Sequence, residues 1–154
     1  MIISNKCFED NVQGKVHKSC PIPMGLLLLV NDGFITHSND CVFFKARQPI
    51  DVDGGDFFDK TEQECFYNEL RVSDYTDYDV VSVAVNVSEV IANKLQNTMP
   101  SKKFEVITIF DDFDDEIDAI IKFHTLRDEE AQYIDIQYID EYQQPLYIYR
   151  TESD

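Results

Sequence analysis

The densest run of carboxylates in the sequence, at residues 111–118, follows an apolar stretch at residues 104–110. β-branched and aromatic residues dominate that stretch, which predicts a strand buried on both faces. Asp111, Asp112 and Asp114 come directly after it. Acids at the carboxyl end of a parallel strand can hold Mg²⁺, so a magnesium-dependent phosphotransferase or hydrolase is one candidate function. Such an enzyme normally also needs a Lys or Arg aimed at the phosphate, and the nearest lysines lie at the opposite end of the strand.

A second acidic stretch, residues 51–62, is similar to an EF-hand calcium loop. Acids stand at its first, third, ninth and twelfth positions. It departs from the pattern where the loop must turn, because Gly55 replaces the fifth-position ligand and Asp56 stands where glycine is needed. We therefore predict a polar loop here, with no metal ion and no cofactor for the chain.

Histidines and cysteines form no catalytic or metal-binding pattern in the sequence. None of the three histidines lies beside a Gly-x-Ser-x-Gly elbow, and none of the four cysteines forms a C-x-x-C pair. The sequence also has no P-loop and no Gly-x-Gly-x-x-Gly motif. These observations predict a protein that is not an enzyme and whose cysteines are reduced thiols, as in a cytoplasmic protein.

The hydrophobic period changes inside the acid run. Phe113, Ile117 and His124 recur at helical spacing, which predicts an amphipathic helix with Asp111 or Asp112 as its N-cap. Carboxylates in a first helical turn are stabilised by unpaired N–H groups and the macrodipole, by about 0.3–1 kcal/mol each. A solvated helix start explains part of the run. A bound cation or a basic partner would relieve the repulsion that remains.

The rest of the pattern predicts an α+β chain. The capping box Thr61-x-x-Glu64 begins a helix over residues 62–72, and residues 73–79 read as a linker. The other predicted elements are a meander of three short strands over residues 24–47, a strand over 80–87, a helix over 89–97, and strands over 131–139 and 146–150. We predict one domain over residues 1–154, with a mixed β-sheet, an N-terminal antiparallel meander and two or three helices packed on the sheet.

The composition describes a folded chain with a strongly acidic surface. The chain is 44% hydrophobic, and 30 Asp and Glu residues against 13 Lys and Arg give a formal net charge of −17. This charge disfavours direct binding to nucleic acid or to an anionic membrane, and it favours a basic protein partner. No signal peptide is apparent and the longest apolar run is too short to span a bilayer, so a cytoplasmic location is expected.

Three features of the second half carry a resemblance: the acid run at 111–118, the triplet Asp128-Glu129-Glu130, and the Tyr-rich end from Tyr133 to Tyr149. In overall character the chain resembles bacterial immunity proteins, which neutralise toxin domains delivered by neighbouring cells. The resemblance implies an inhibitor that covers the active or substrate-binding surface of a basic toxin domain, such as a nuclease. The carboxylates and tyrosines assigned to partner binding are Asp111, Asp112, Asp114, Asp115, Glu116, Asp118, Asp128, Glu129, Glu130, Tyr133, Asp135, Tyr147 and Tyr149.

Two other functions stay open on the sequence alone. A nucleic-acid mimic would bind a DNA-binding protein with carboxylates in place of phosphates, and it needs acids spaced along an elongated face. The clustering at 111–118 favours a compact patch instead. In the magnesium enzyme, Asp111→Asn would abolish metal binding, whereas in an inhibitor it would only weaken the complex.

Overall fold

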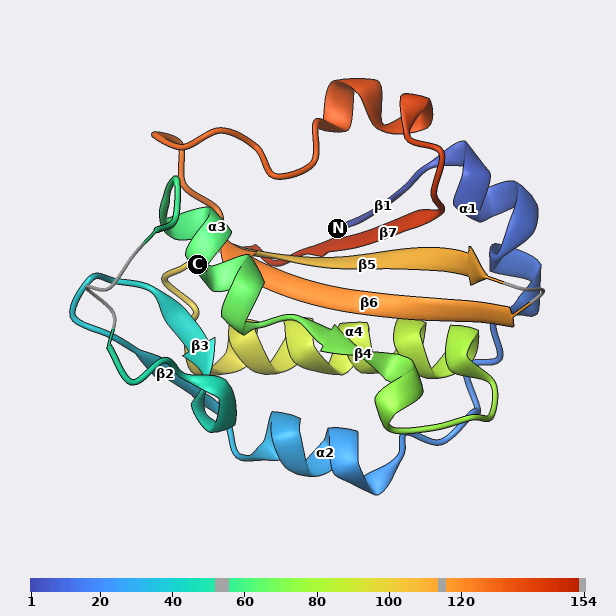
Figure 1. Ribbon diagram of the computed structural model, residues 1–154, viewed down its shortest axis with the longest axis horizontal. Helices are drawn as coiled ribbons and strands as arrows, with labels where there is room; N and C mark the ends of the chain where they lie inside the picture. The colour runs from blue at the N-terminus through green and yellow to red at the C-terminus, as the bar shows by residue number, and fades with distance from the viewer. Residues whose placement is uncertain (52–55, 114–115, 153–154) are drawn as a thin grey trace.

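The computed structural model describes residues 1–51, 56–113 and 116–152 (Figure 1). A five-stranded sheet has the order β1-β7-β5-β6-β4, and every described pair of neighbours is antiparallel. Its strands are β1 (Ile2–Ser4), β4 (Leu70–Arg71), β5 (Phe104–Phe113), β6 (Glu116–Thr125) and β7 (Leu146–Arg150). A separate antiparallel pair consists of β2 (Phe34–Thr36) and β3 (Val42–Phe44).

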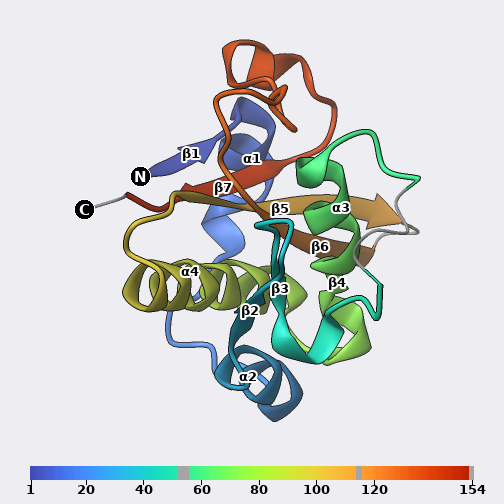
Figure 2. The ribbon, with the colours of Figure 1, turned by 90° about the vertical axis from the view of Figure 1, so that its left-hand side faces the viewer.

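Helices cover both faces of the large sheet, so the α+β class is confirmed. They are α1 (Lys6–Asn11), α2 (Met24–Asn31), α3 (Lys60–Tyr67) and α4 (Val80–Thr98), with short 3-10 turns η1 (Gln13–Lys15), η2 (Lys45–Arg47), η3 (Val72–Asp74) and η4 (Ile136–Glu141). Figure 2 shows α4 on one face of the sheet with α2 beyond it, and α3 on the other face. The sequence predicted a mixed sheet with parallel and antiparallel strands, but all pairs among the described strands are antiparallel.

The predicted strand over 80–87 and helix over 89–97 are one helix, α4. The alternating valines suggest a strand, but every residue from Val81 to Ser88 is buried in the helix. A helix that is buried all round has no polar face, so its hydrophobic period carries little information. Asp79 begins the helix, because its side chain accepts a hydrogen bond from the backbone N–H of Ser82. No helix in the described residues has the length and apolar character to cross a membrane.

The predicted strand at 104–110 is confirmed and is longer than expected, whereas the helix predicted from Phe113 is wrong. The chain turns back and forms β6, which pairs with β5 over ten residue pairs. Ala119, Ile121 and Phe123 alternate along β6 into the core beneath α4. The same apolar residues fit a helical period and a strand period, and the long antiparallel pairing with β5 favours the strand. Asp111 and Asp112 are therefore strand residues and cap no helix.

Two further segments that were predicted as strands have other structures. Residues 24–30 form α2, in which Leu26, Leu29 and Val30 are buried at helical spacing and Leu28 is exposed. The hairpin part of the predicted meander is present as β2 and β3. Of the strand predicted over 131–139, residues 131–135 are irregular and residues 136–139 belong to η4, while the strand predicted at 146–150 is present as β7.

Each face of the sheet has its own core. On the α4 side, Val106, Phe110 and Phe123 pack with Ile91 and Leu95 in the main core. The opposite face has a smaller cluster, which consists of Ile107, Ile134, Ile139, Leu146 and Ile148. Period-two alternation along β5 and β7 sends neighbouring residues into these different cores.

Glu64 on α3 is fully buried and joins the two sheets. Its Oε2 accepts from the backbone N–H of Val42 on β3 at 2.7 Å, and its Oε1 accepts from the backbone N–H of Thr125 on β6 at 2.9 Å. The hydroxyl of Thr125 donates to Oε2 at 2.9 Å, and Arg127 Nη1 donates to Oε1 at 2.6 Å. Four donors thus balance a carboxylate that has no contact with water.

Asn68 continues the same connection one helical turn later. Its Oδ1 accepts from the backbone N–H of Phe44 at 3.0 Å. Its Nδ2 donates to the carbonyl of Val42 at 2.9 Å and to the carbonyl of Phe123 at 3.2 Å. The two side chains occupy the place of a strand between β3 and β6 and satisfy backbone groups at both edges.

Replacing Glu64 by Gln should lower the free energy of unfolding by about 3–5 kcal/mol, because Arg127 would lose the carboxylate that balances its buried charge. Urea denaturation followed by circular dichroism measures the change. Glu129→Gln is the matched control: Glu129 is exposed, and its replacement should change stability by less than about 0.5 kcal/mol. Equal denaturation midpoints for the two variants would contradict the role given to Glu64.

Candidate protein-binding site

The predicted acidic residues lie at two ends of the β5–β6 hairpin. Asp111 and Asp112 end β5, and Glu116 and Asp118 begin β6. The triplet at 128–130 follows β6 at its other end (Figure 1). Asp114 and Asp115 lie outside the described residues. The hairpin therefore separates the two groups by the length of its strands.

The inner carboxylates of the first group are balanced within the protein. Asp111 and Asp118 stand directly opposite each other across the strands, an arrangement that destabilises a sheet unless it is compensated. Arg71 Nη1 donates to Asp118 at 2.9 Å, and the Ser73 hydroxyl donates to it at 2.8 Å. Gln144 Nε2 donates to Asp111 at 2.6 Å. Burial raises the pKa of Asp118, but the hydrogen bonds from Arg71 and Ser73 outweigh it and hold the pKa below its usual value.

The outer carboxylates of this group are exposed to solvent. Asp112 and Glu116 are exposed, and neither carboxylate makes a hydrogen bond or ion pair with another described residue. They differ in this from Asp111 and Asp118, which lie next to them. This end of the hairpin thus presents negative charge outward, while its inner pair is hydrogen-bonded within the protein.

The segment predicted as a linker, residues 73–79, supplies the other side of this acidic end. A cavity of about 810 Å³ lies between the segment and the hairpin, and five carboxylates line it together with two cations: Asp77, Asp79, Asp111, Glu116, Asp118, Lys15 and Arg71. Tyr78, between two of these acids in sequence, is 78% exposed. The sequence signal was the alternation of Asp and Tyr in SDYTDYD, which we interpreted only as polarity.

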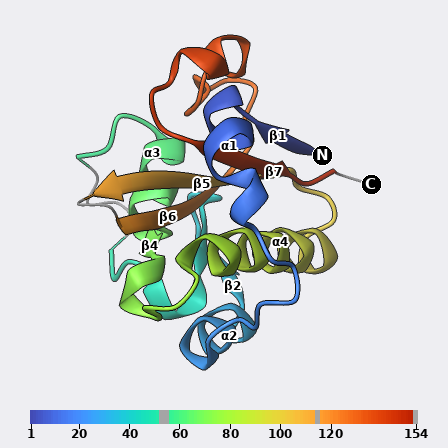
Figure 3. The ribbon, with the colours of Figure 1, turned by 90° about the vertical axis from the view of Figure 1, so that its right-hand side faces the viewer.

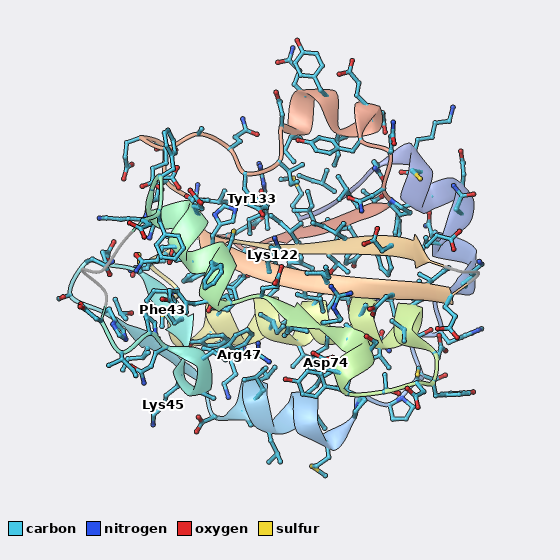
Figure 4. All side chains as sticks on the ribbon, in the orientation of Figure 1. Phe43, Lys45, Arg47, Asp74, Lys122 and Tyr133 are labelled. Atoms are coloured by element: carbon cyan, nitrogen blue, oxygen red, sulfur yellow. The ribbon has the colours of Figure 1, made fainter. Side chains whose placement is uncertain are left out.

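The tyrosines predicted to bind a partner are mostly turned inward. Tyr147 is buried in the main core and its hydroxyl donates to Glu89 at 2.8 Å, so its assignment to a partner surface is wrong. Tyr149 is half-buried against the same core. The half-buried Tyr133 accepts a hydrogen bond from Lys122 Nζ at 2.8 Å (Figure 4).

The acids after β6 have more varied roles. Glu130 binds the first turn of α3, whose N-cap is Asp59: it accepts from the backbone N–H of Thr61 at 2.9 Å and from the Thr61 hydroxyl at 2.7 Å. Burial raises the pKa of Glu130, but these hydrogen bonds and the charge of Arg127 lower the pKa by a larger amount, so the net shift is downward. Asp128 and Glu129 are exposed. Asp135 accepts from the backbone N–H of Gln137 and caps η4.

The surroundings of this triplet are mixed in charge. A cavity of about 1220 Å³ beside it is lined by the triplet, Asp40 and Glu152 and by five cationic side chains, Lys60, Lys102, Lys103, Arg127 and Arg150. Three of these cations are paired: Lys102 lies 2.7 Å from Asp40, Arg127 lies 2.6 Å from Glu64, and Arg150 lies 2.7 Å from Glu105. The acidic end of the hairpin is therefore the better candidate for binding a cationic partner.

A third cluster of charges lies inside the sheet. Arg150 Nε donates to Glu105 Oε2 at 2.7 Å, and His124 Nε2 lies 3.2 Å from Glu105 Oε1. Glu105 and His124 are both buried. Burial raises the pKa of Glu105, but its bonds to His124 and Arg150 lower it below its usual value. In the part of the chain that the structure describes, no three His, Cys, Asp or Glu side chains are grouped to hold a metal ion.

Comparison with known families places the chain in one of them. The model of the family described as "Uncharacterized protein PM0498 family" matches residues 3–154, so the chain belongs to this family. None of the curated proteins and none of the solved structures compared with the chain matches it.

Stability should fall as the pH drops below about 4.5. Glu105, Asp118 and Glu130 have lowered pKa values in the folded chain, against usual values of 4.5, 3.8 and 4.5. Their contribution is present above the usual values and is lost as the pH falls through the lowered ones. Urea denaturation at pH 6, 4.5 and 3.5 should show this decline, and Asp118→Asn should make it shallower. Stability that rises between pH 4.5 and 3.5 would contradict the assignment.

Proposed function

We propose that this member of the PM0498 family is an inhibitor that binds a basic protein in the cytoplasm and covers that protein's active or substrate-binding surface. The proposal gives it no catalytic activity of its own. A bacterial toxin domain is the partner that the resemblance to immunity proteins suggests. The acidic end of the hairpin is the observation that carries the proposal.

The acidic end combines carboxylates from two distant parts of the sequence. Asp77 comes from the segment before α4, and Asp112 and Glu116 come from the β5–β6 hairpin. Exposed charges of one sign raise the rate at which an oppositely charged partner is met. Mutual repulsion makes such an arrangement unfavourable in the free protein, and a basic partner removes this repulsion.

Arg71 and Ser73 give the acidic end a fixed geometry. Both bind the carboxylate of Asp118, and they lie where the chain passes from β4 into η3. The hairpin is therefore tied to the segment that carries Asp77 and Tyr78. A surface that is already ordered loses less conformational entropy when a partner binds.

Tyr78 supplies this end with an aromatic side chain. Tyrosine is enriched at interface hot spots because it offers a rigid area with a polar tip. At 78% exposure the ring has most of its area available for contact. The compact grouping of acids around one cavity also supports a patch that receives basic side chains, rather than an elongated row that imitates nucleic-acid phosphates.

The test begins with a pull-down from the source cell or its close competitors at low and moderate salt. The partner should be basic and lose its activity in the complex. The variant Asp77→Asn, Asp112→Asn, Glu116→Gln should then slow association about tenfold at low salt and less at higher salt, since these charges act through the solvent. Stopped-flow or surface plasmon resonance measures this rate.

The control variant Asp32→Asn, Glu129→Gln, Glu141→Gln makes the same change in net charge at exposed positions elsewhere. It should slow association much less. If both variants have the same effect, only the net charge matters, and the acidic end has no special role. If no basic protein is retained at either salt, the inhibitor function is wrong.

A further inference from the structure

The helix α2 presents an exposed surface that is apolar. Met24 and Leu28, one helical turn apart, are 68% and 62% exposed and form a ridge on the outer side of the helix, the α2 ridge. The opposite side of the helix is buried in the main core through Leu26, Leu29 and Val30. Although 28% of the residues in the chain are charged, residues 19–31 include no charged residue. The α2 ridge therefore differs in chemistry from the acidic surface around it.

The exposure of this ridge is unusual for the helix that carries it. A surface helix normally has a polar outer face, and a helix that is apolar all round is normally buried. α2 lies beyond α4 at the margin of the molecule, so the rest of the chain covers only its inner side (Figure 2). The apolar surface continues beside the helix, where Ile22, Leu27 and Val90 help to line a groove of about 520 Å³. Apolar side chains gathered at a surface are typical of a contact with another molecule.

The helix α2 adjoins the acidic end. A Cβ placed on Gly25 would lie 3.0 Å from Cδ1 of Tyr75, so the first turn of α2 touches the segment 73–79. This segment forms one side of the acidic cavity and carries the exposed Tyr78. Figures 1 and 3 both show the chain between η3 and α4 beside α2. The acidic and the apolar surfaces are therefore neighbours.

The chain that leads into α2 makes a second connection between the two surfaces. Lys15 lines the acidic cavity, and Cys20 lines the groove beside α2. Burial, the charge of Asp79 and a hydrogen bond with Asp79 raise the pKa of the Cys20 thiol, and Asp79 itself lines the acidic cavity. Asn86 Nδ2 lies within hydrogen-bond distance of the carbonyls of His17, Lys18 and Cys20 and holds this chain on α4. A surface fixed in this way needs little further ordering when a partner binds.

One partner of ordinary size can cover both surfaces. The eight residues of α2 span about 12 Å, so the whole ridge lies close to the contact between Gly25 and Tyr75. A standard interface buries about 800 Å² on each partner, which corresponds to a patch roughly 30 Å across. The acids select cationic side chains on that partner, and the uncharged ridge selects an apolar recess beside them.

We propose that the α2 ridge is the apolar part of the interface with the same basic protein, which receives Met24 and Leu28 in an apolar recess beside its cationic surface. This inference rests on the proposed function and adds a division of roles. The acidic end determines how fast the partner is met, and the α2 ridge determines how long it stays bound.

The test variant is Met24→Gln with Leu28→Gln, which removes apolar area but keeps residues that favour a helix. It should raise the dissociation rate about tenfold or more, while the salt dependence of association stays as in the wild type. Surface plasmon resonance with the partner from the pull-down measures both rates. The control is Phe58→Gln with Phe66→Gln, which changes two side chains that are 87% and 64% exposed at another site.

The outcomes separate the two proposals. Faster dissociation of the ridge variant, but not of the control, supports the α2 ridge when both have the wild-type urea midpoint. If the Gln variant is less stable, Met24→Ala with Leu28→Ala removes the same contacts with the strongest helix former and gives the same comparison.

An unchanged dissociation rate of the ridge variant overturns the α2 ridge and leaves the inhibitor function standing. Failure to retain any basic protein overturns both proposals. If sedimentation shows a wild-type dimer that the ridge variant dissociates, a second copy of the chain covers the ridge and the inference is wrong.

Discussion

The buried carboxylate of Glu64 is the constraint on which the arrangement of this fold depends. A charge without water must be balanced completely, and here the donors come from β3, from β6 and from Arg127 after β6. The requirement fixes α3 between the two sheets, where Asn68 repeats the connection one turn later. Because α3 is fixed, its exposed face and the cap before it are fixed as well.

The distribution of cations gives the second constraint. Of the 13 Lys and Arg residues, five line the cavity beside residues 128–130, and two line the cavity at the other end of the hairpin. One of those two, Arg71, pairs with Asp118 and is needed to offset its repulsion with Asp111. No described cation pairs with the carboxylates of Asp112 and Glu116. The molecule is not uniformly acidic, and a basic partner would meet it in a preferred orientation.

Much of the fold could be predicted from local hydrophobic patterns in the sequence. The elements that were predicted wrongly share one physical cause. The strands predicted at 104–110 and 146–150 are present, because the local hydrophobic pattern of each segment agrees with its burial. The helix predicted over residues 62–72 is present only as far as Tyr67, and Leu70–Arg71 form a strand instead. β6 and α4 were missed because the pairing with β5 and burial on all sides act over long sequence distances. The same limit applies to the site. Asp112 and Glu116 were found by composition, but Tyr147 is a core residue, and the role of residues 73–79 appears only when the chain folds back beside the hairpin.

Charge alone is a weak basis for a specific inhibitor. At physiological ionic strength the attraction between exposed charges is screened beyond about 8 Å, so carboxylates guide the encounter more than they hold the complex. Burial of apolar area is much less sensitive to salt and slows dissociation. Tyr78, which is 78% exposed beside the acidic end, offers such an apolar area. A chain with this charge gains discrimination among basic proteins only by such a contact, because many basic surfaces satisfy the charge and few also offer an apolar recess at the required place.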